Sequence, residues 1–343
     1  MQTLLTRNWM KSTTKNLASD LLVAHSNTVQ QIAETLQTAS RVLISTHEHP
    51  DGDALGSSLA VHFALKSKGI ESTVYIPDPA PDFFQFLPGF DALTTTKPNI
   101  SDFDTVILLD YTQLYRTHLE QEVLGRPRVI SIDHHYDNPK QTAINLIVAE
   151  GAATAHILFP LFLALDIPIT QDIATCLLTG IFTDTGSFMH DGVTPDILQI
   201  ASYLMKKGAR LSHIAHETYQ KKDLPSLQIW GRALSRILVN EKTGASISLI
   251  TLKDLQECNA TLDDLSGVVS MLNTLPQTKY AMLLVEFESG KIKGSLRTEP
   301  QKGIDVSKIA KRLGGGGHKM ASGFEITGHI VQEDGIWRVK AVA

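Results

Sequence analysis

Four segments of this chain share one arrangement, in which an apolar stretch ends and aspartate or histidine residues follow it. The stretches before three of them are short aliphatic or β-branched runs, which are typical of strands covered on both faces of a parallel sheet. We treat all four segments as the ends of buried segments of one sheet. Ligands bind outside the carboxyl ends of such strands, so we expect the segments to converge. In chain order they are His47–Asp53, Asp110, Asp133–His135 and Asp184.

Helical patterns alternate with the predicted strands in the first half of the chain. Leu55, Leu59 and Phe63 recur every four residues up to Gly69, which is typical of a helix closed by a glycine. The alternation of strand and helix indicates a parallel α/β unit. The predicted strands are Arg41–Thr46, Thr73–Ile76, Thr105–Leu109 and Val129–Ile132, and the other predicted helices lie at about 26–39, 152–165 and 171–181.

The second half of the chain has a different pattern. Residues 194–239 are mostly helical in period, with Pro195 and Pro225 at positions typical of first helical turns. The elements predicted beyond them are strands at Ala245–Leu252 and Tyr280–Phe287 and a short helix at Val306–Leu313. The sequence therefore predicts an α/β protein with a parallel-sheet domain at 1–222, a helical connection at 223–240 and a smaller mixed α/β domain at 241–343.

Composition limits the classes of function. The 343 residues carry a formal net charge of −5, from 31 Lys and Arg against 36 Asp and Glu, which argues against binding long duplex DNA through a broad basic surface. The two cysteines, Cys176 and Cys258, fit neither a disulfide scaffold nor a zinc motif and favour a cytoplasmic location. The start of the chain has no continuous apolar segment, and no run approaches about 18 apolar residues, so we expect neither export nor a membrane span.

Carboxylates gathered in one crevice repel one another unless cations neutralise them, and two divalent cations balance four carboxylates in formal charge. A single aspartate after a strand is more often a helix cap or turn residue, and a single histidine is more often a hydrogen-bonded polar group. The joint occurrence of His-x-x-x-Asp-x-Asp, Asp-His-His and two further aspartates favours a two-metal site over capping alone.

The segments resemble the motifs of the DHH phosphoesterases, a family named for the triplet that stands here as Asp133-His134-His135. The first family motif resembles His47–Ser57 (HEHPDGDALGS), the second matches Asp110 in VILLDYT, and the fourth resembles Gly180–Phe188 (GIFTDTGSF). The second domain resembles the DHH-associated domain through Ser295–Arg297 and through Gly314–Gly323 (GGGGHKMASG). This combination is similar to the nanoRNase (RecJ-like) oligoribonuclease and pAp-phosphatase branch of the family.

The resemblance implies that six residues bind two divalent ions. One ion would be held by His47, Asp51 and Asp110, and the other by Asp53, Asp110, His134 and Asp184, so that Asp110 bridges them. The resemblance also implies two catalytic roles, in which Asp133 orients a ligand imidazole and His135 faces the substrate phosphate. Mixed imidazole and carboxylate ligands suit manganese, and magnesium, cobalt and zinc are compatible with the same ligand types.

The glycine run Gly314–Gly317 resembles a flexible linker in composition alone. It lies, however, between an amphipathic helix and an apolar terminal segment, and His318 follows it, so its N–H groups can hold an anion. Between Lys291 and Lys319 there are eight Lys or Arg and two acids, which form a local basic patch. We expect a short phosphodiester chain to bridge the two domains. The predicted substrate-binding residues, with Arg297 and His318 at family positions, are His135, Arg297, Gly315, Gly316, Gly317 and His318.

The resemblance implies a metal-dependent phosphoesterase that hydrolyses short oligoribonucleotides to nucleoside 5′-monophosphates and converts 3′-phosphoadenosine 5′-phosphate to AMP. The expected partners are short RNA or a small nucleotide, with no membrane, and a homodimer is compatible with the sequence. Three alternatives stay open: a phosphodiesterase for cyclic di-AMP or pApA, a family II-like pyrophosphatase, and a noncatalytic nucleotide or RNA binder. Glu48, His49 and His190 are interpreted as rim residues.

Overall fold

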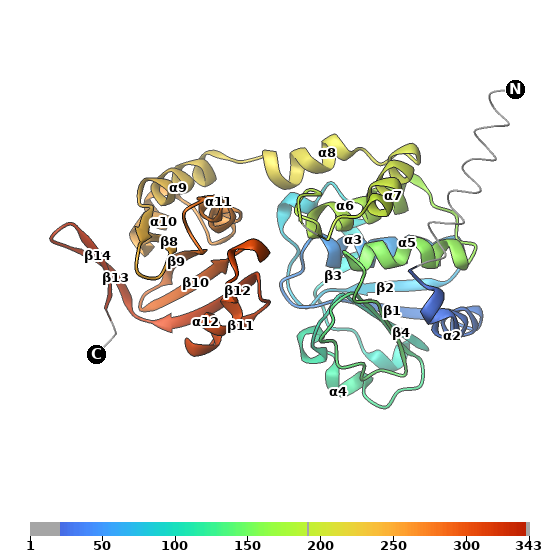
Figure 1. Cartoon of the computed structure of the whole chain (residues 1–343). Helices are drawn as coiled ribbons and strands as arrows, with labels where there is room; N and C mark the ends of the chain where they lie inside the picture. Colours follow the sequence, from blue (N-terminus) through green and yellow to red (C-terminus); the bar gives the residue numbers. More distant parts are fainter. Residues whose placement is uncertain (1–20, 191, 341–343) are drawn as a thin grey trace, which may run out of the picture. The chain divides into compact units, whose positions relative to one another are not determined.

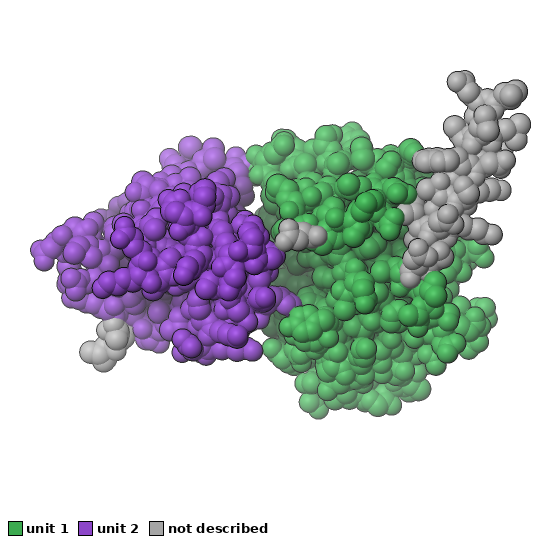
Figure 2. Space-filling model, viewed as in Figure 1, with its two compact units in different colours: residues 1–221 green, residues 222–343 purple. Residues whose placement is uncertain are grey.

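Short, largely buried strands form a parallel sheet in the first of two compact units, which are Met1–Lys221 and Lys222–Ala343 (Figure 2). The computed structural model describes residues 21–190 and 192–340. The first sheet has the order β3-β2-β1-β4-β5-β6, and all neighbouring strands run parallel, which confirms the predicted α/β class. Its strands are β1 (Arg41–Ser45), β2 (Glu71–Tyr75), β3 (Leu93–Thr94), β4 (Thr105–Leu109), β5 (Val129–Asp133) and β6 (Ile144–Ile147).

The strand order changes direction between β1 and β4, and ligand sites of open α/β sheets lie outside the carboxyl ends of the strands at such a point. The segments that begin at His47 and Asp110 follow β1 and β4, and Asp133 ends β5. Asp184 is different, because it is the last residue of helix α6 (Gln171–Asp184). The expectation that all four segments end parts of one sheet is therefore wrong for Asp184, which reaches the others from a helix.

The longer helices pack on one face of this sheet, and the single-turn helix α4 packs on the other face with loops and short 3-10 turns (Figure 1). Val42 and Ile44 of β1 belong to the larger core with the helices, whereas Leu43 between them belongs to a smaller core with Phe103 and Leu119. None of the helices within the described residues is long and apolar enough to cross a membrane. The remaining helices of this unit are α2 (Ser26–Gln37), α3 (Gly52–Ser67), α4 (Glu120–Val123), α5 (Thr154–Ala164), α7 (Pro195–Lys206) and α8 (Leu211–Ala215), with a π-helical turn at His216–Gln220 and 3-10 turns at Val23–His25, Asp82–Phe84, Phe90–Ala92, Ile100–Asp102 and Leu114–Thr117.

Glycines allow α3 and α6 to pack backbone against backbone. A Cβ atom on Gly56 of α3 would lie 2.5 Å from the carbonyl oxygen of Cys176 in α6. A Cβ atom on Gly180 of α6 would lie 2.5 Å from Oδ1 of Asp53. Since α3 carries Asp53 and α6 ends at Asp184, this close contact sets the distance between two of the predicted ligands.

The second unit contains a mixed sheet in the order β11-β12-β10-β9-β8-β7, in which β8 and β9 run parallel and the other neighbours antiparallel. Helices α9, α10 and α11 lie on one face of this sheet and α12 lies on the other (Figure 1). Leu283 of β9 accordingly packs in the core with the first three helices, and Leu284 packs against the core that includes α12. The strands are β7 (Leu238–Asn240), β8 (Ala245–Ile250), β9 (Tyr280–Glu288), β10 (Lys291–Arg297), β11 (Gly316–Gly317) and β12 (Ala321–Thr327), with a separate ribbon of β13 (His329–Glu333) and β14 (Ile336–Lys340). The helices are α9 (Leu224–Ser235), α10 (Leu252–Cys258), α11 (Val268–Asn273) and α12 (Val306–Arg312), with 3-10 turns at Asp263–Leu265 and Pro300–Lys302.

Residues 223–240, which the sequence predicts as a separate helical connection, contain α9 and β7 of this second unit. Ile229 and Ala233 of α9 are buried in the core beneath the sheet. The amphipathic pattern of this segment thus reflects packing within the second unit.

The glycine run is an ordered part of the second unit. Gly314 has a φ of +80° directly after α12, its N–H donates to the carbonyl of Lys311 (3.2 Å), and the N–H of Gly315 donates to that of Ala310 (2.9 Å). This pattern closes the carboxyl end of a helix. Gly316 and Gly317 then form β11 against β12. Two of the N–H groups considered for anion binding are therefore used by α12.

Replacement of Gly56 by alanine is expected to destabilise the first unit, because the added methyl group meets the backbone of α6 rather than a flexible side chain. Overpacking of this kind lowers the free energy of unfolding by about 1–3 kcal/mol. Gly231→Ala in α9 is the matched control, since no atom lies within 4 Å of its added Cβ and alanine is the better helix former. Denaturant unfolding measures both variants, and a Gly56→Ala protein as stable as wild type would contradict the close packing of α3 on α6.

Candidate metal centre

The loop after β1 supplies three of the predicted ligands and starts α3. His47 is buried, and Asp51 is the N-cap of α3, with Oδ1 accepting the N–H of Asp53 (3.0 Å). Asp53 is itself buried and accepts the N–H groups of Thr154 (2.5 Å) and Ala155 (2.9 Å) at the start of α5. Both aspartates therefore cap helices, which by itself would explain an aspartate at these positions. Both also lie close to other predicted ligands, so capping is not their only contact.

Asp110 lies at the centre of the cluster. Its Oδ2 is 3.7 Å from Nε2 of His47, its Oδ1 is 3.5 Å from Nε2 of His134, and the hydroxyl of Thr154 donates to Oδ1 (3.2 Å). The backbone φ of Asp110 is +54°, a left-handed conformation that aspartate and asparagine tolerate better than most residues. One buried carboxylate thus faces His47 through Oδ2, and His134 and His135 (Nδ1, 3.5 Å) through Oδ1.

The structure brings all six predicted ligands together in two groups. Donor atoms of the members of each group lie within 4.8 Å of one another. His134 links the groups, since its Nε2 is 3.3 Å from Oδ2 of Asp184 and 3.5 Å from Asp110. The first group is His47, Asp51 and Asp110, and the second is Asp53, His134 and Asp184.

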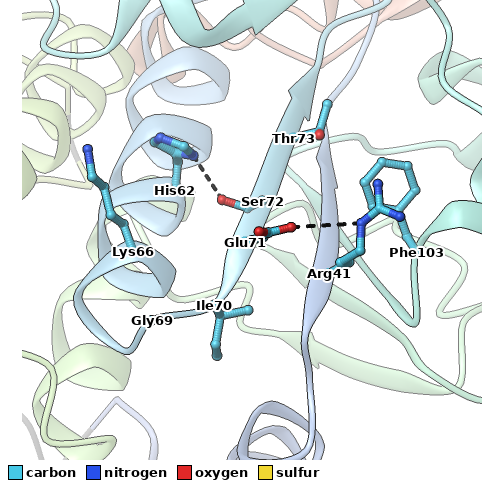
Figure 3. Close-up of a pocket in the computed structure, with 9 residues that line it drawn as sticks. All are labelled: Arg41, His62, Lys66, Gly69, Ile70, Glu71, Ser72, Thr73 and Phe103. Atoms are coloured by element: carbon cyan, nitrogen blue, oxygen red, sulfur yellow. Dashed lines mark hydrogen bonds and ion pairs between the residues drawn. The ribbon is translucent and has the colours of Figure 1, made fainter.

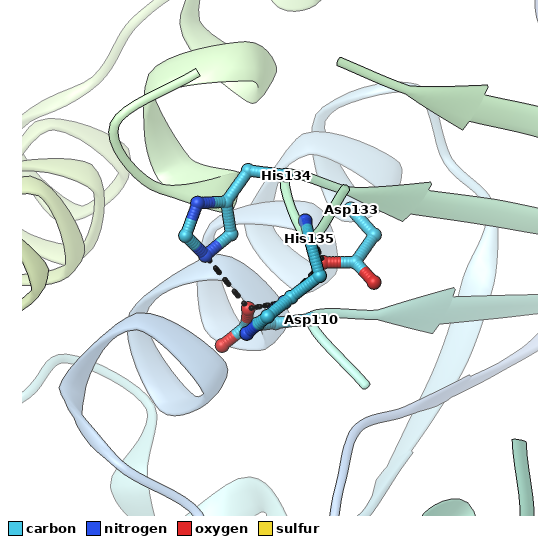
Figure 4. Close-up of side chains that lie close together, drawn as sticks. All are labelled: Asp110, Asp133, His134 and His135. Carbon is cyan, nitrogen blue, oxygen red and sulfur yellow. Dashed lines mark hydrogen bonds and ion pairs between the residues drawn. The ribbon is translucent and has the colours of Figure 1, made fainter. Parts of the chain in front are cut away.

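Both imidazoles of the Asp133-His134-His135 triplet approach Oδ1 of Asp110, and His135 also pairs with Asp133 (Figure 4). The fully buried carboxylate of Asp133 accepts both the backbone N–H (3.1 Å) and the Nδ1 hydrogen bond (2.7 Å) of His135. It also accepts the side-chain amide of Asn138 (2.7 Å) and the N–H of Thr112 (3.2 Å). His134 is oriented instead by the carbonyl of Gly151, 3.2 Å from its Nδ1. Within the triplet, Asp133 therefore orients the imidazole of His135 rather than that of His134.

The proton affinities of the cluster follow from its burial and charge. Burial lowers the pKa of His47 and His134, but the hydrogen bonds and charge of Asp110 outweigh it and raise these pKa values to about 9 and about 11. Burial and the neighbouring charge of Asp110 raise the pKa of Asp53 to about 7, and burial raises the pKa of Asp184 well above its ordinary value. Burial raises the pKa of Asp110, but the hydrogen bonds and charges of His134 and His47 outweigh burial and hold this pKa well below the usual range.

The direction of these pKa shifts means that the closely spaced carboxylates favour protons on the imidazoles beside them and on one another. Divalent cations would replace those protons, and carboxylate oxygens with imidazole nitrogens form a donor set suited to such ions. The residues of both groups therefore fit metal ions in charge and in ligand type.

Two residues outside the sequence motifs also hold the cluster. Thr154 contacts both Asp53 and Asp110, and Asn138 contacts Asp133. A threonine before an apolar helical stretch is a recognisable helix-start signal. Its contacts with aspartates 101 and 44 residues earlier are not recognisable from the sequence, because they depend on the tertiary fold.

In the second unit, Arg297 of β10 lies beside the turn that joins β11 and β12. Arg297 pairs in register with Ala321, which exchanges backbone hydrogen bonds with His318. Burial lowers the pKa of Arg297, its guanidinium donates to the carbonyl of Leu296 (2.9 Å), and no carboxylate of the described residues forms an ion pair with it. The basic patch is partly neutralised, because Lys291 pairs with Glu288.

A separate hollow of about 490 Å³ lies at the opposite end of the first sheet (Figure 3). It is lined by the amino ends of β1 and β2, including Arg41 and Glu71, which form an ion pair with each other (3.9 Å). His62 at its edge hydrogen-bonds Ser72 (2.8 Å). None of the predicted site residues lines this hollow.

Comparison with known proteins gives two family matches. Residues 41–181 match the DHH family, N-terminal domain, and residues 247–341 match the DHHA1 domain. The chain is 32% identical over 301 residues to a bifunctional oligoribonuclease and PAP phosphatase NrnA of Thermus thermophilus, which covers 87% of this chain and 88% of that protein. It is 22% identical to the equally named protein of Bacillus subtilis, with coverage of 86% and 92%.

Solved structures resemble this fold. An exopolyphosphatase-related protein from Bacteroides fragilis has a TM-score of 0.82 at 26% identity, covering 87% of this chain and 91% of that chain. RecJ of Thermus thermophilus, solved in complex with Mn2+, has a TM-score of 0.51 at 14% identity and covers 88% of this chain and 51% of that chain. The second likeness concerns the fold alone.

Replacement of Asp133 by asparagine is expected to lower stability, because an amide cannot accept all of the N–H groups that the carboxylate accepts. Each buried donor left unpaired costs about 1–3 kcal/mol. Asp137→Asn is the matched control, since that side chain is exposed in the same loop. Thermal unfolding without added metal compares the variants, and equal midpoints would refute the supporting role of Asp133.

Proposed function

The chain belongs to the DHH family, and we propose that it is a metal-dependent phosphoesterase that hydrolyses short oligoribonucleotides to nucleoside 5′-monophosphates and 3′-phosphoadenosine 5′-phosphate to AMP. The observation that carries the proposal is Asp110, whose two oxygens face the imidazoles of His47 and His134 in two adjoining ligand groups. The names of the NrnA relatives support both substrates.

The proposal assigns two divalent ions, with manganese as the expected metal, to the two groups. His47, Asp51 and Asp110 would hold one ion, and Asp53, Asp110, His134 and Asp184 the other. Two such ions would supply a water of lowered pKa and would stabilise the attacking and leaving oxygens of phosphate-ester hydrolysis. The carbonyl of Gly151 accepts from Nδ1 of His134, which keeps Nε2 directed at Asp110 and Asp184.

His135 is the proposed contact to the substrate phosphate. Asp133 accepts the hydrogen bond from Nδ1 of His135 and fixes the ring. Burial lowers the pKa of His135, but the hydrogen bond to Asp133 and the charge of Asp110 outweigh it and raise this pKa. A protonated imidazole donates well to a phosphate oxygen, so the Asp133–His135 pair would bind and orient the ester.

The proposed substrate contacts of the second unit are Arg297, Gly315, Gly316, Gly317 and His318, of which Arg297 and Gly316 have the strongest support. A half-buried guanidinium that forms no ion pair with a carboxylate of the described residues favours an anionic ligand. Gly314 and Gly317 have positive φ, and a Cβ on Gly315 would meet the backbone of β12, whereas a Cβ on Gly316 would meet nothing within 4 Å. The fold itself therefore has no steric need for glycine at 316, while close approach of a ligand to the backbone would need it.

The alternatives differ in substrate or in turnover. Cyclic di-AMP, pApA and pyrophosphate each present phosphate to the same ligand groups, and a noncatalytic binder would hold nucleotides without cleaving them. Incubation of labelled dinucleotide, 3′-phosphoadenosine 5′-phosphate, cyclic di-AMP, pApA and pyrophosphate with the protein and Mn2+ ranks these functions. Rapid release of nucleoside 5′-monophosphate from the dinucleotide is expected, and binding without any product would refute the enzymatic proposal.

Asp110→Ala is expected to abolish hydrolysis more completely than replacement of any other candidate ligand, because it removes the carboxylate that is proposed to bind both ions. The loss should exceed the roughly 100-fold effect typical of losing an outer partner of a metal ligand. Steady-state rates of alanine variants of all six residues, measured over a range of Mn2+ concentrations, make the comparison. Near-normal turnover of Asp110→Ala with added Mn2+ would rule out the bridging role.

Arg297→Ala is expected to raise KM for a dinucleotide with little change in kcat, since a contact made before and during the reaction contributes uniform binding. Loss of a hydrogen bond to a charged group weakens binding by about 1.5–3 kcal/mol, or roughly 10–150-fold. Gly316→Ala should raise KM without loss of stability. Lys291→Ala is the control, because that exposed lysine pairs with Glu288.

Kinetics on RNA of two, five and twenty nucleotides test the preferred substrate length. A preference for the longest RNA would reject the role of these contacts in short-substrate binding.

A further inference from the structure

Glu48 and Arg116 connect the loop after β1 to the loop after β4. The backbone N–H of Glu48 donates to the carbonyl of Arg116 (2.7 Å), and a guanidinium nitrogen of Arg116 donates to the carbonyl of Glu48 (3.3 Å). Nε of Arg116 is 3.7 Å from the carboxylate of Glu48, whose other oxygen is 3.0 Å from Nε2 of His118. Glu48, interpreted from the sequence as a rim residue, is therefore held from both its backbone and its side chain.

This connection acts directly on a candidate ligand. Nδ1 of His47 lies 2.6 Å from the same Glu48 carbonyl that accepts from Arg116. A guanidinium nitrogen of Arg116 lies 3.4 Å from the same Nδ1, so the carbonyl is its nearer partner. The carbonyl keeps the hydrogen on Nδ1 and leaves the lone pair of a neutral ring on Nε2, the atom that faces Asp110. The orientation of the Glu48 peptide thus decides which way the His47 ring presents its ligand atom.

The two loops need such a connection because neither has a relaxed backbone. Asp110 and Thr112 in one loop and His49 in the other have positive φ values between +48° and +54°. Left-handed conformations of residues other than glycine cost free energy and persist only where surrounding contacts hold them. The hydrogen bonds between Glu48 and Arg116 are contacts of this kind, and they join the segments that carry His47 and Asp110.

We propose that Arg116 is a positioning residue, which holds the Glu48 peptide so that His47 and Asp110 present their donor atoms to one metal ion. The inference rests on the proposed function only in that a divalent ion occupies the group of His47, Asp51 and Asp110. Arg116 differs from Arg297 in a way that separates positioning from substrate binding. The charge of Arg116 is paired with Glu48, whereas no carboxylate of the described residues forms an ion pair with Arg297.

The test is a calorimetric titration of the metal-free protein with Mn2+, in the absence of substrate. Arg116→Ala is expected to weaken one of the two Mn2+ sites by about 10–100-fold, as is typical for loss of an outer partner of a metal ligand, and to leave the other site unchanged. Arg116→Lys keeps the positive charge but loses the planar guanidinium group. The Mn2+ affinity of its weakened site should therefore lie between those of wild type and Arg116→Ala. Arg126→Ala is the matched control, because Arg126 also donates to a backbone carbonyl, that of Phe103 (3.0 Å), but contacts no candidate ligand.

Kinetics provide the second readout. Excess Mn2+ should restore kcat of Arg116→Ala, and KM for a dinucleotide at saturating Mn2+ should equal that of wild type. Unchanged Mn2+ affinities in Arg116→Ala would overturn the proposal, and so would a raised KM at saturating Mn2+, since it would make Arg116 a substrate contact. If thermal melts reveal that Arg116→Ala is unfolded, the same titration is made with Arg116→Lys. A wild-type Mn2+ affinity of Arg116→Lys would then overturn the proposal that the guanidinium group of Arg116 positions the ligands. A wild-type protein that binds two Mn2+ ions but cleaves no nucleotide would refute the proposed function alone.

Discussion

Repulsion between buried carboxylates is the constraint on which the arrangement of the first unit depends. Asp53 and Asp110 are almost completely buried, and Asp51 and Asp184 lie within reach of them. The starts of α3 and α5 direct N–H groups at Asp51 and Asp53, where the helix dipole favours negative charge. Imidazoles flank Asp110 on both sides. The parallel sheet, the close packing of α3 on α6 and the large apolar core hold these groups together at a cost in electrostatic free energy.

The sequence predicts the centre of this fold well and its edges poorly. β1, β4 and β5 are continuous apolar runs, and their burial on both faces leaves little ambiguity. β10 is different, because it alternates exposed lysines at 291 and 293 with the buried Ile292 and Gly294, and we did not predict it. β11 is a two-residue strand of glycines that exists only because β12 lies beside it. Such elements depend on tertiary pairing rather than on local preference.

The candidate site divides in the same way. The positions of His47, Asp51 and Asp110 follow from strand ends, which sequence patterns reveal. The partner of Asp133 could not be foreseen, since the turn to Asn138 decides that His135 and not His134 meets its carboxylate. Asp184 arrives on a helix whose approach depends on Gly56 and Gly180, two residues without side-chain chemistry. Glu48 also has a role that only the hydrogen bonds from a distant loop reveal.

All six candidate ligands and the Asp133–His135 pair lie within Met1–Lys221, whereas Arg297 and Gly316 lie in the second unit. Under the proposed function, bond cleavage and the choice of substrate are encoded by different stretches of the chain. Substitutions in the second unit can then alter which phosphate esters are accepted without disturbing the buried charges of the first. An ancestral hydrolase built in this way can diversify its specificity by evolving one module while selection keeps the other fixed.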